Sequence, residues 1–368
     1  VQTCALPISI PMPLRPIPKR VLMIKAHSMG IGDILRSSAA WRVMKDHWPG
    51  VELHLLFLSR HAGYPSEALI AHHHLLSSAT FLTIREGEPY SDDVRKVSNF
   101  KILRQVWQLA RRLQPDCVID FEWAGSRTSV VTWLAAWASR AHSVGIAQFP
   151  LRSWFYQHAA ASSAQYALRH GLSEPFDYTH RDFVALAALG LERGDAAIEL
   201  KVDESARQKI LAFLPPKGGQ VLRVGLNIGC ATFGAAHKRM NLSTLAEYFK
   251  RWMNERPIQL ILSGAPNELE INQEFLSQLR HLGVDTQQIF DMAGQTDVFT
   301  LPALIDQCDL FVSTDSGPYH MAVALRKPCV CWMTYKEVTS YHAHPWVRCL
   351  VNPDEATFMN TVQTLSTH

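Results

Sequence analysis

The hydrophobic positions of this chain fall into short apolar runs that alternate with longer segments in which apolar residues recur every three or four positions. The short runs are typical of buried strands, and the longer segments are typical of amphipathic helices. In the first half, the pattern predicts strands at Val21–Lys25, Val51–Phe57, Thr80–Ile84, Cys117–Phe121 and Ser143–Ile146, and helices at Asp33–Trp48, Asn99–Leu113 and Ala124–Ser139. In the second half, it predicts strands at Leu222–Ile228, Ile258–Ser263, Asp309–Ser313, Pro328–Trp332 and Arg348–Val351, and helices at Leu242–Asn254, Glu268–Leu282, Val298–Gln307, Gly317–Leu325 and Asp354–Leu365. This alternation favours an α/β fold with two parallel sheets, each flanked by helices.

A composition break separates the two halves. Residues 214–219 read Leu-Pro-Pro-Lys-Gly-Gly, which indicates a linker between a helix and a strand. We therefore expect a disordered leader at 1–19, Rossmann-like domains at 20–214 and 220–352, and a C-terminal helix at 353–368. Two such domains facing each other across a cleft would bring the carboxyl ends of their strands to the ligand.

Charge and cysteine content argue against several classes of protein. A formal net charge of +3 on 368 residues gives no reason to expect a nucleic-acid partner. The seven cysteines, several of them in apolar runs, favour buried thiols in a reducing cytoplasm over a disulfide framework. No metal site is expected, because Cys329 and Cys331 lack a second ligand pair and the run His72-His73-His74 has no ligand partner nearby.

The aromatic residues bear on membrane contact. No segment is apolar over the roughly 20 residues that span a bilayer. Trp133, Trp137 and Trp154 lie near Arg140 and Arg152 in the sequence. Burial of these rings is the favoured interpretation, and peripheral contact with an inner membrane is the alternative.

The segment Ser313–His320 carries the clearest chemical signal. It reads Ser-Thr-Asp-Ser-Gly-Pro-Tyr-His, follows a predicted strand and opens a helix, so its backbone N–H groups can bind a phosphate. Gly317 permits close approach of the backbone, and Asp315 and Ser316 are placed to cap the helix. His320 lies about one turn inside it. The pattern predicts a nucleotide-linked ligand.

The loop Lys25–Asp33 follows the first strand of the N-terminal half. A dinucleotide fingerprint would need a third glycine where Leu35 stands and an acid where the second strand ends at Ser59-Arg60. Asp33 has two interpretations, a helix N-cap or a general base for a substrate hydroxyl. Several arginines of this half are candidates for a pocket that binds an anionic substrate.

Three loops of the C-terminal half add candidate contacts. Thr232 and Lys238 follow its first strand and suit a phosphate, although a solvated loop lysine explains Lys238 as well. Glu268 follows the second strand, where an acid can bind ribose hydroxyls or favour a helix start. Gln295 and Thr296 form a turn that can contact the base or the ribose.

Together these residues resemble glycosyltransferase family 9, the bacterial heptosyltransferases of lipopolysaccharide core synthesis. The resemblance covers roughly residues 20–350. Its most specific part is the ordered set Ala293–Thr296, Leu304-Ile305, Asp309–Val312 and the Asp-Ser-Gly-Pro-x-His segment. Gly32-Asp33, the strand entry Pro115–Asp120 and the Lys238 loop agree in order and spacing.

The resemblance implies a GT-B fold with an acceptor domain at 20–214 and a nucleotide-sugar domain at 220–352. It implies an inverting transfer without metal or cofactor, from a nucleotide sugar, typically ADP-heptose, to a lipid-linked or soluble saccharide. Asp33 would be the base and Glu268 would reach the ribose. The other implied donor contacts are Thr232, Lys238, Gln295, Thr296, Asp315, Ser316, Gly317 and His320. The candidate acceptor contacts are Gly30, Gly32, Arg60 and Arg127.

The chain departs from the family pattern in three places. Gly30-Ile31-Gly32-Asp33 is extended, Arg239-Met240-Asn241 replaces an aromatic-Pro pair, and Met333–Lys336 replaces a Gly-Pro-Thr loop. The sugar, the base and the acceptor therefore stay open. A non-catalytic sugar-nucleotide or glycan-binding module and a nicotinamide oxidoreductase are the alternative functions.

Overall fold

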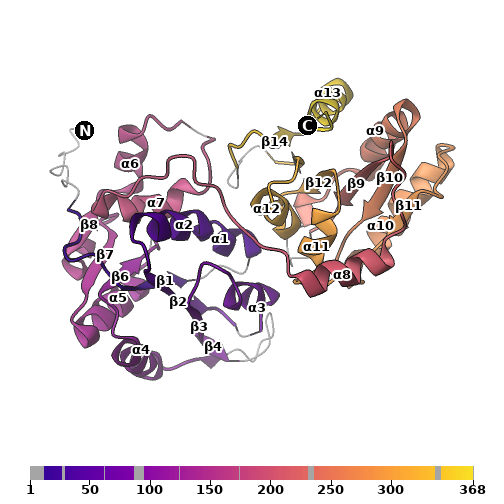
Figure 1. Cartoon of the computed structure of the whole chain (residues 1–368). Helices are drawn as coiled ribbons and strands as arrows, with labels where there is room; N and C mark the ends of the chain where they lie inside the picture. Colours follow the sequence, from indigo (N-terminus) through magenta and orange to yellow (C-terminus); the bar gives the residue numbers. More distant parts are fainter. Residues whose placement is uncertain are drawn as a thin grey trace. The chain divides into compact units, whose positions relative to one another are not determined.

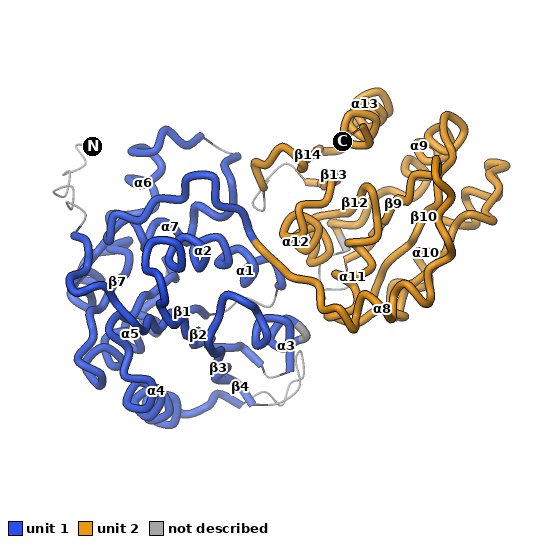
Figure 2. The backbone as a smooth tube through the Cα atoms, viewed as in Figure 1, with its two compact units in different colours: residues 1–198 blue, residues 199–368 orange. Residues whose placement is uncertain are grey.

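The computed structural model describes residues 12–26, 30–61, 63–86, 95–123, 125–173, 175–230, 236–335 and 341–367. The chain divides into two compact units, residues 1–198 and 199–368 (Figure 2). The division falls before the expected linker at 215–219 because helix α8 (Glu204–Phe213) packs on the second unit. Ala206 and Ile210 of α8 join Ala303 and Leu304 of α11 (Thr300–Asp306) in one buried cluster.

Unit 1 is built on a six-stranded sheet in which every neighbouring pair is parallel. The strand order is β3-β2-β1-β6-β7-β8. The strands are β1 Arg20–Ala26, β2 Glu52–Ser59, β3 Ser78–Thr83, β6 Cys117–Asp120, β7 His142–Ile146 and β8 His158–Ala160. A short hairpin, β4 Arg85–Glu86 with β5 Arg95–Lys96, lies beyond β3.

Helices cover both faces of this sheet (Figure 1). The helices of unit 1 are α1 Ile31–Leu35, α2 Ser37–His47, α3 Pro65–Ala71, α4 Asn99–Leu113, α5 Ser126–Ser139, α6 Ser163–Arg169 and α7 His180–Leu186. Leu22 and Ile24 of β1 pack against α4 and α5, while Lys25 points to the opposite face, toward α2 and α7. Both faces are buried, which explains why the strands read as nearly continuous apolar runs.

Unit 2 repeats the plan with a second all-parallel sheet in the order β11-β10-β9-β12-β13-β14. The strands are β9 Leu222–Asn227, β10 Ile258–Leu262, β11 Ile289–Asp291, β12 Leu310–Thr314, β13 Cys329–Met333 and β14 Val347–Val351. The remaining helices are α9 Leu242–Glu255, α10 Leu269–His281, α12 Gly317–Ala324 and α13 Glu355–Leu365. Helices α9, α10 and α13 pack on one face, and α8 and α11 on the other.

The expected fold class, two Rossmann-like parallel-sheet units, is confirmed. In each sheet the direction of the strand order reverses beside the first strand, between β1 and β6 in unit 1 and between β9 and β12 in unit 2. Ligands of such sheets bind at the carboxyl ends of the strands at this reversal. Within the described ranges, no helix is long and apolar enough to cross a membrane.

Candidate active site

The reversal point of unit 2 holds a carboxylate, Asp315, directly between strand β12 and helix α12. Asp315 is buried, and its Oδ2 accepts a hydrogen bond from Lys238 Nζ at 2.8 Å. Lys238 Nζ also lies 3.3 Å from the Asp315 carbonyl oxygen. An ammonium group has three N–H donors, so one donor of Lys238 is left for a further acceptor. Thr314 Oγ1 donates to the Lys238 carbonyl and fixes the lysine loop against β12.

Two aromatic side chains complete the surroundings of Asp315. Tyr335, just after β13, donates to Asp315 Oδ2, and its ring lies 5.6 Å from Lys238 Nζ. His320 Nε2 lies 3.8 Å from Asp315 Oδ1, and its Nδ1 lies 3.0 Å from His342 Nε2. Burial alone would raise the pKa of Asp315, but His320, Lys238 and Tyr335 outweigh it and hold the pKa below the ordinary aspartate value. Asp315 is therefore an anion that orients a lysine.

Ser316 precedes helix α12 but does not cap it with its side chain, contrary to the sequence prediction. Its Oγ donates to Asn227 Oδ1 at 3.0 Å, and Asn227 is the last residue of β9. This bond joins the two strands at the reversal point and leaves the first backbone N–H groups of α12 without a side-chain cap from Ser316. Such groups carry the positive end of the helix dipole.

Glu268 lies at the end of strand β10, beside the tip of β9. Its Oε2 accepts from Ala265 N at 2.8 Å, while Oε1 is buried and has no hydrogen-bond partner among the described residues. Burial raises the pKa of this carboxyl. Gly229 packs against it so tightly that an added Cβ would lie 2.1 Å from Oε1. The glycine is thus required by the close approach of the carboxylate.

The other donor candidates lie farther along the same edge or outside the description. Gln295 and Thr296 follow the edge strand β11, three strands from β12, and Gln295 Nε2 donates to the Asp291 carbonyl at 2.9 Å. Thr232 lies outside the described residues. The structure therefore brings Lys238, Asp315 and His320 together and places Glu268 after β10, two strands from β12.

In unit 1, the candidate base Asp33 lies inside α1, so the helix N-cap expected of it is wrong; Gly30 occupies that position. The Asp33 side chain is 42% exposed. Its Oδ1 accepts from the Tyr178 hydroxyl and lies 3.6 Å from Arg36 Nη1. Arg36 also stacks over the Tyr178 ring at 4.7 Å. The carboxylate is thus oriented by two side chains while part of it stays accessible.

Arg36 belongs to a buried ionic cluster that is centred on Asp182. Asp182 of α7 is fully buried and accepts from Lys25 Nζ at 3.1 Å, from Arg36 Nη2 at 3.0 Å and from Ser37 Oγ at 2.6 Å. Burial would raise the pKa of Asp182, but Arg36 and Lys25 lower it below the ordinary value. Burial, aided by Arg36, lowers the pKa of Lys25. One buried carboxylate therefore pairs with two buried cations, and Asp33 is a second acidic neighbour of Arg36.

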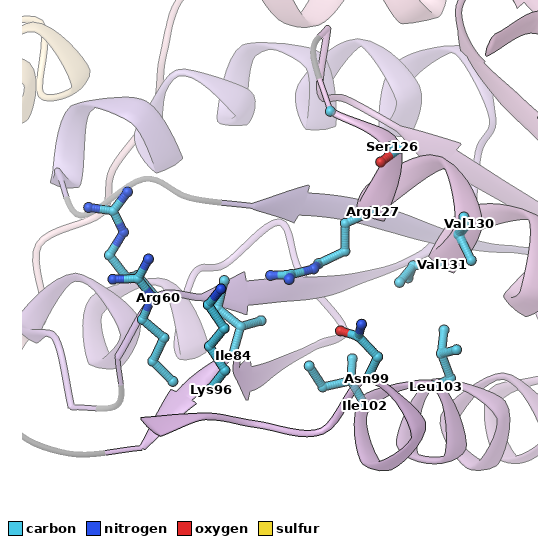
Figure 3. Close-up of a pocket in the computed structure, with 12 residues that line it drawn as sticks. Arg60, Ile84, Lys96, Asn99, Ile102, Leu103, Ser126, Arg127, Val130 and Val131 are labelled. Carbon is cyan, nitrogen blue, oxygen red and sulfur yellow. The ribbon is translucent and has the colours of Figure 1, made fainter. Parts of the chain in front are cut away.

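A cavity of about 600 Å³ in unit 1 is lined by four cationic side chains. Figure 3 labels three of them, Arg60, Lys96 and Arg127. Arg60 follows β2, Arg127 starts α5, and Arg85 and Lys96 come from the β4–β5 hairpin. Among the described residues, no aspartate or glutamate lines the cavity, and none of the four cations makes a side-chain hydrogen bond or ion pair. Unpaired guanidinium groups around a cavity attract anions.

The cavity unites the candidate acceptor contacts Arg60 and Arg127, whereas Gly30 and Gly32 lie at the start of α1, outside its lining. The sequence prediction missed Arg85 and Lys96, because a two-residue hairpin strand gives no periodic signal. It also missed Tyr178, Tyr335 and Asn227, which act through contacts distant in sequence. Only the position of Asn227 at a strand end could have singled it out.

A family model covers most of the chain. The model of the family described as glycosyltransferase family 9 (heptosyltransferase) matches residues 106–347. A search of curated proteins finds no match.

Solved structures show the same fold at low identity. The ADP-heptose lps heptosyltransferase II of E. coli is 17% identical with a TM-score of 0.64, over 94% of this chain and 98% of that chain. A glycosyl transferase family 9 protein of Veillonella parvula DSM 2008 is 15% identical with a TM-score of 0.65, over 95% and 97% of the two chains. The UDP-GlcNAc 2-epimerase of Methanocaldococcus jannaschii is 13% identical with a TM-score of 0.55, over 95% and 93%.

Proposed function

The chain belongs to glycosyltransferase family 9, and from this premise we propose that it transfers a heptose-like sugar from a nucleoside-diphosphate donor to an anionic saccharide, with inversion and without a metal ion. The contact of Lys238 with Asp315 at the reversal point of unit 2 carries the proposal. There a strand end, an oriented ammonium group and a helix N-terminus converge, and this combination suits a diphosphate.

In the proposed reaction, Asp33 takes the proton of the acceptor hydroxyl. The oxygen attacks the anomeric carbon from the face opposite the diphosphate, and the bond from that carbon to the diphosphate oxygen breaks. The diphosphate leaves with the electron pair, and the configuration inverts. Lys238 and the first N–H groups of α12 stabilise the charge that develops on it.

Several observations support a general base in unit 1 and a donor site in unit 2. Asp33 is the accessible carboxylate held by Tyr178 and Arg36, as a general base must be held. The family model begins after Asp33, so the role of Asp33 rests on this geometry and on the sequence resemblance. Glu268 offers an unpartnered carboxylate oxygen that suits a ribose hydroxyl. The similar E. coli heptosyltransferase II is an ADP-heptose enzyme, and we propose an ADP-sugar donor on that likeness.

The cation-lined cavity supports an anionic acceptor, such as a phosphorylated or carboxylated saccharide of lipopolysaccharide. A carboxylate or phosphate there would meet Arg60, Arg85, Lys96 and Arg127, and no acid among the described lining residues would compete with it. We expect Arg127→Gln to raise the acceptor KM about tenfold with a smaller change in kcat, because a charged hydrogen bond contributes about 1.5–3 kcal/mol. An unchanged KM would remove Arg127 from the acceptor site.

Nucleotide binding and product analysis test the proposal together. Isothermal titration with ADP, UDP and GDP measures donor preference, and Lys238→Ala should weaken ADP binding at least tenfold. Lys209→Ala, an exposed lysine on α8, is the matched control. NMR of the transferred sugar reports its anomeric configuration, and assays with EDTA test the need for a metal. Binding without transfer would instead favour the non-catalytic module.

A further inference from the structure

Two neighbouring helices of unit 1 turn tryptophan side chains outward. Helices α4 and α5 pack side by side on one face of the sheet (Figure 1). The ring of Trp107 on α4 lies 5.1 Å from that of Trp137 on α5, and Trp133 stacks on Trp137 at 6.0 Å. Trp133 and Trp137 are 47% and 64% exposed, so the favoured sequence interpretation that these rings are buried is wrong.

The same helices carry positive charge and no aspartate or glutamate. Arg104 and Arg112 of α4 and Arg140 at the end of α5 are exposed. Their side chains make no hydrogen bond or ion pair with any described residue. Arg111 ties the two helices together by donating to the Ala138 carbonyl at 3.3 Å. Cations and indole rings therefore share one rigid surface.

Helical spacing places these residues on one outward stripe of each helix. Phe100, Arg104 and Trp107 recur at intervals of four and three on α4, and Trp133, Trp137 and Arg140 do so on α5. Phe100 is 76% exposed. We call this surface the α4–α5 aromatic face and define it by Phe100, Arg104, Trp107, Trp133, Trp137 and Arg140.

We propose that the α4–α5 aromatic face docks on a bilayer rich in anionic phospholipid. Indole rings prefer the headgroup level of a membrane, and arginine reaches lipid phosphates while its apolar stem stays among the chains. The acid-free surface is complementary to an anionic leaflet, where each arginine adds about fivefold in affinity. A neutral partner surface would leave the free guanidinium groups without counter-charges.

The face also adjoins the cation-lined cavity. Leu103 and Val130 line that cavity, and Trp107 and Trp133 lie one turn farther along the same two helices. Docking would thus bring the cavity next to the lipid headgroups. The inference goes beyond the proposed reaction and does not depend on it, because vesicle binding is measured without donor or acceptor.

Co-sedimentation of the full chain with vesicles tests the proposal. Phosphatidylglycerol vesicles provide the anionic surface, and phosphatidylcholine vesicles provide the neutral one, both at low salt. We expect at least tenfold tighter binding to the anionic vesicles. Trp133→Ser/Trp137→Ser should lower that affinity about tenfold or more, and Arg104→Gln/Arg140→Gln about 25-fold. Phe213→Ser, at a 70% exposed position on α8, is the matched control and should bind as the wild type does.

Three results would overturn the proposal. The wild type could fail to bind anionic vesicles, or Phe213→Ser could lose as much affinity as the tryptophan variant. Alternatively, the wild type could elute as a dimer and the tryptophan variant as a monomer in size-exclusion chromatography, with vesicle binding unchanged. That result would show that the face contacts a second copy of the chain. Thermal melts of all variants should match the wild type because every substituted side chain is at the surface.

Discussion

Replacement of Asp182 by asparagine should destabilise unit 1 strongly. Asp182 is 0% exposed and neutralises Lys25 and Arg36, which are 1% and 7% exposed. Asparagine removes the carboxylate that both cations share and leaves buried Lys25 without an ion-pair partner among the described residues. Removal of one partner from such a cluster costs about 3–5 kcal/mol. For a unit of this size, each kcal/mol lowers Tm by about 2–4 °C, so we expect a fall of about 6–20 °C. Arg36 also contacts Asp33, so kcat should fall as well.

Urea unfolding followed by tryptophan fluorescence measures this loss, and ADP binding reports whether unit 2 stays folded. Asp46→Asn is the matched control, because its exposed pair with Arg42 at 3.5 Å should add nothing measurable. Asp182 has a lowered pKa, so its stabilisation is present above the unfolded value of 3.8 and is lost as the pH falls through the folded value. The wild type should show this acid loss and Asp182→Asn should not. A variant within 1 kcal/mol of the wild type would refute the reasoning.

Three other substitutions probe the sites. Asp33→Asn should lower kcat about 10²–10⁴-fold and leave ADP affinity unchanged in titration, because a positioned base contributes that much; near-full turnover would remove Asp33 from the role. Gly229→Ala should weaken ADP binding about tenfold, because its Cβ displaces the carboxylate of Glu268; retained affinity would place Glu268 outside the nucleotide site. Burial raises the pKa of Asp120 to about 6, although the nearby Arg152 opposes this shift. Protonated Asp120 therefore stabilises the folded state fully below pH 3.8, the pKa in the unfolded chain, and this stabilisation is lost as the pH rises through about 6. The wild type should therefore lose stability relative to Asp120→Asn between pH 4 and 7 in denaturant titrations, and parallel pH profiles would contradict this assignment.

Elements whose pattern is local were predictable from the sequence. Helix α4 spans the residues expected of it, because Ile102, Val106 and Leu109 form one buried stripe at helical spacing. The expected helix from Asp33 to Trp48 is instead two helices, α1 and α2, with Arg36 between them. Periodicity does not report the buried pairing of Arg36 with Asp182, which lies 146 positions later in the sequence.

The candidate sites were predictable where a strand end supplies the residue. Asp315 and Lys238 follow strands β12 and β9, and the parallel sheet brings such ends to one edge. The side chains that contact Asp315 and His320 from elsewhere in the sequence could not be predicted in this way. Tyr335 and His342 reach Asp315 and His320 from beyond β13, and no spacing rule relates those positions.

The segment after β13 is where the chain departs from the family pattern, yet it contributes to the anion site. Tyr335 donates to Asp315, and Thr334 donates to the His237 carbonyl, so this segment holds both Asp315 and the lysine loop. The Tyr335 ring also lies beside Lys238, which limits where the free donor of the ammonium group can point. The chain therefore keeps the contact of Lys238 with Asp315 although the Gly-Pro-Thr loop is absent. The segment after β13 supplies the aromatic ring beside the lysine, so in the proposed function the selectivity for the donor should depend on this segment rather than on the strands.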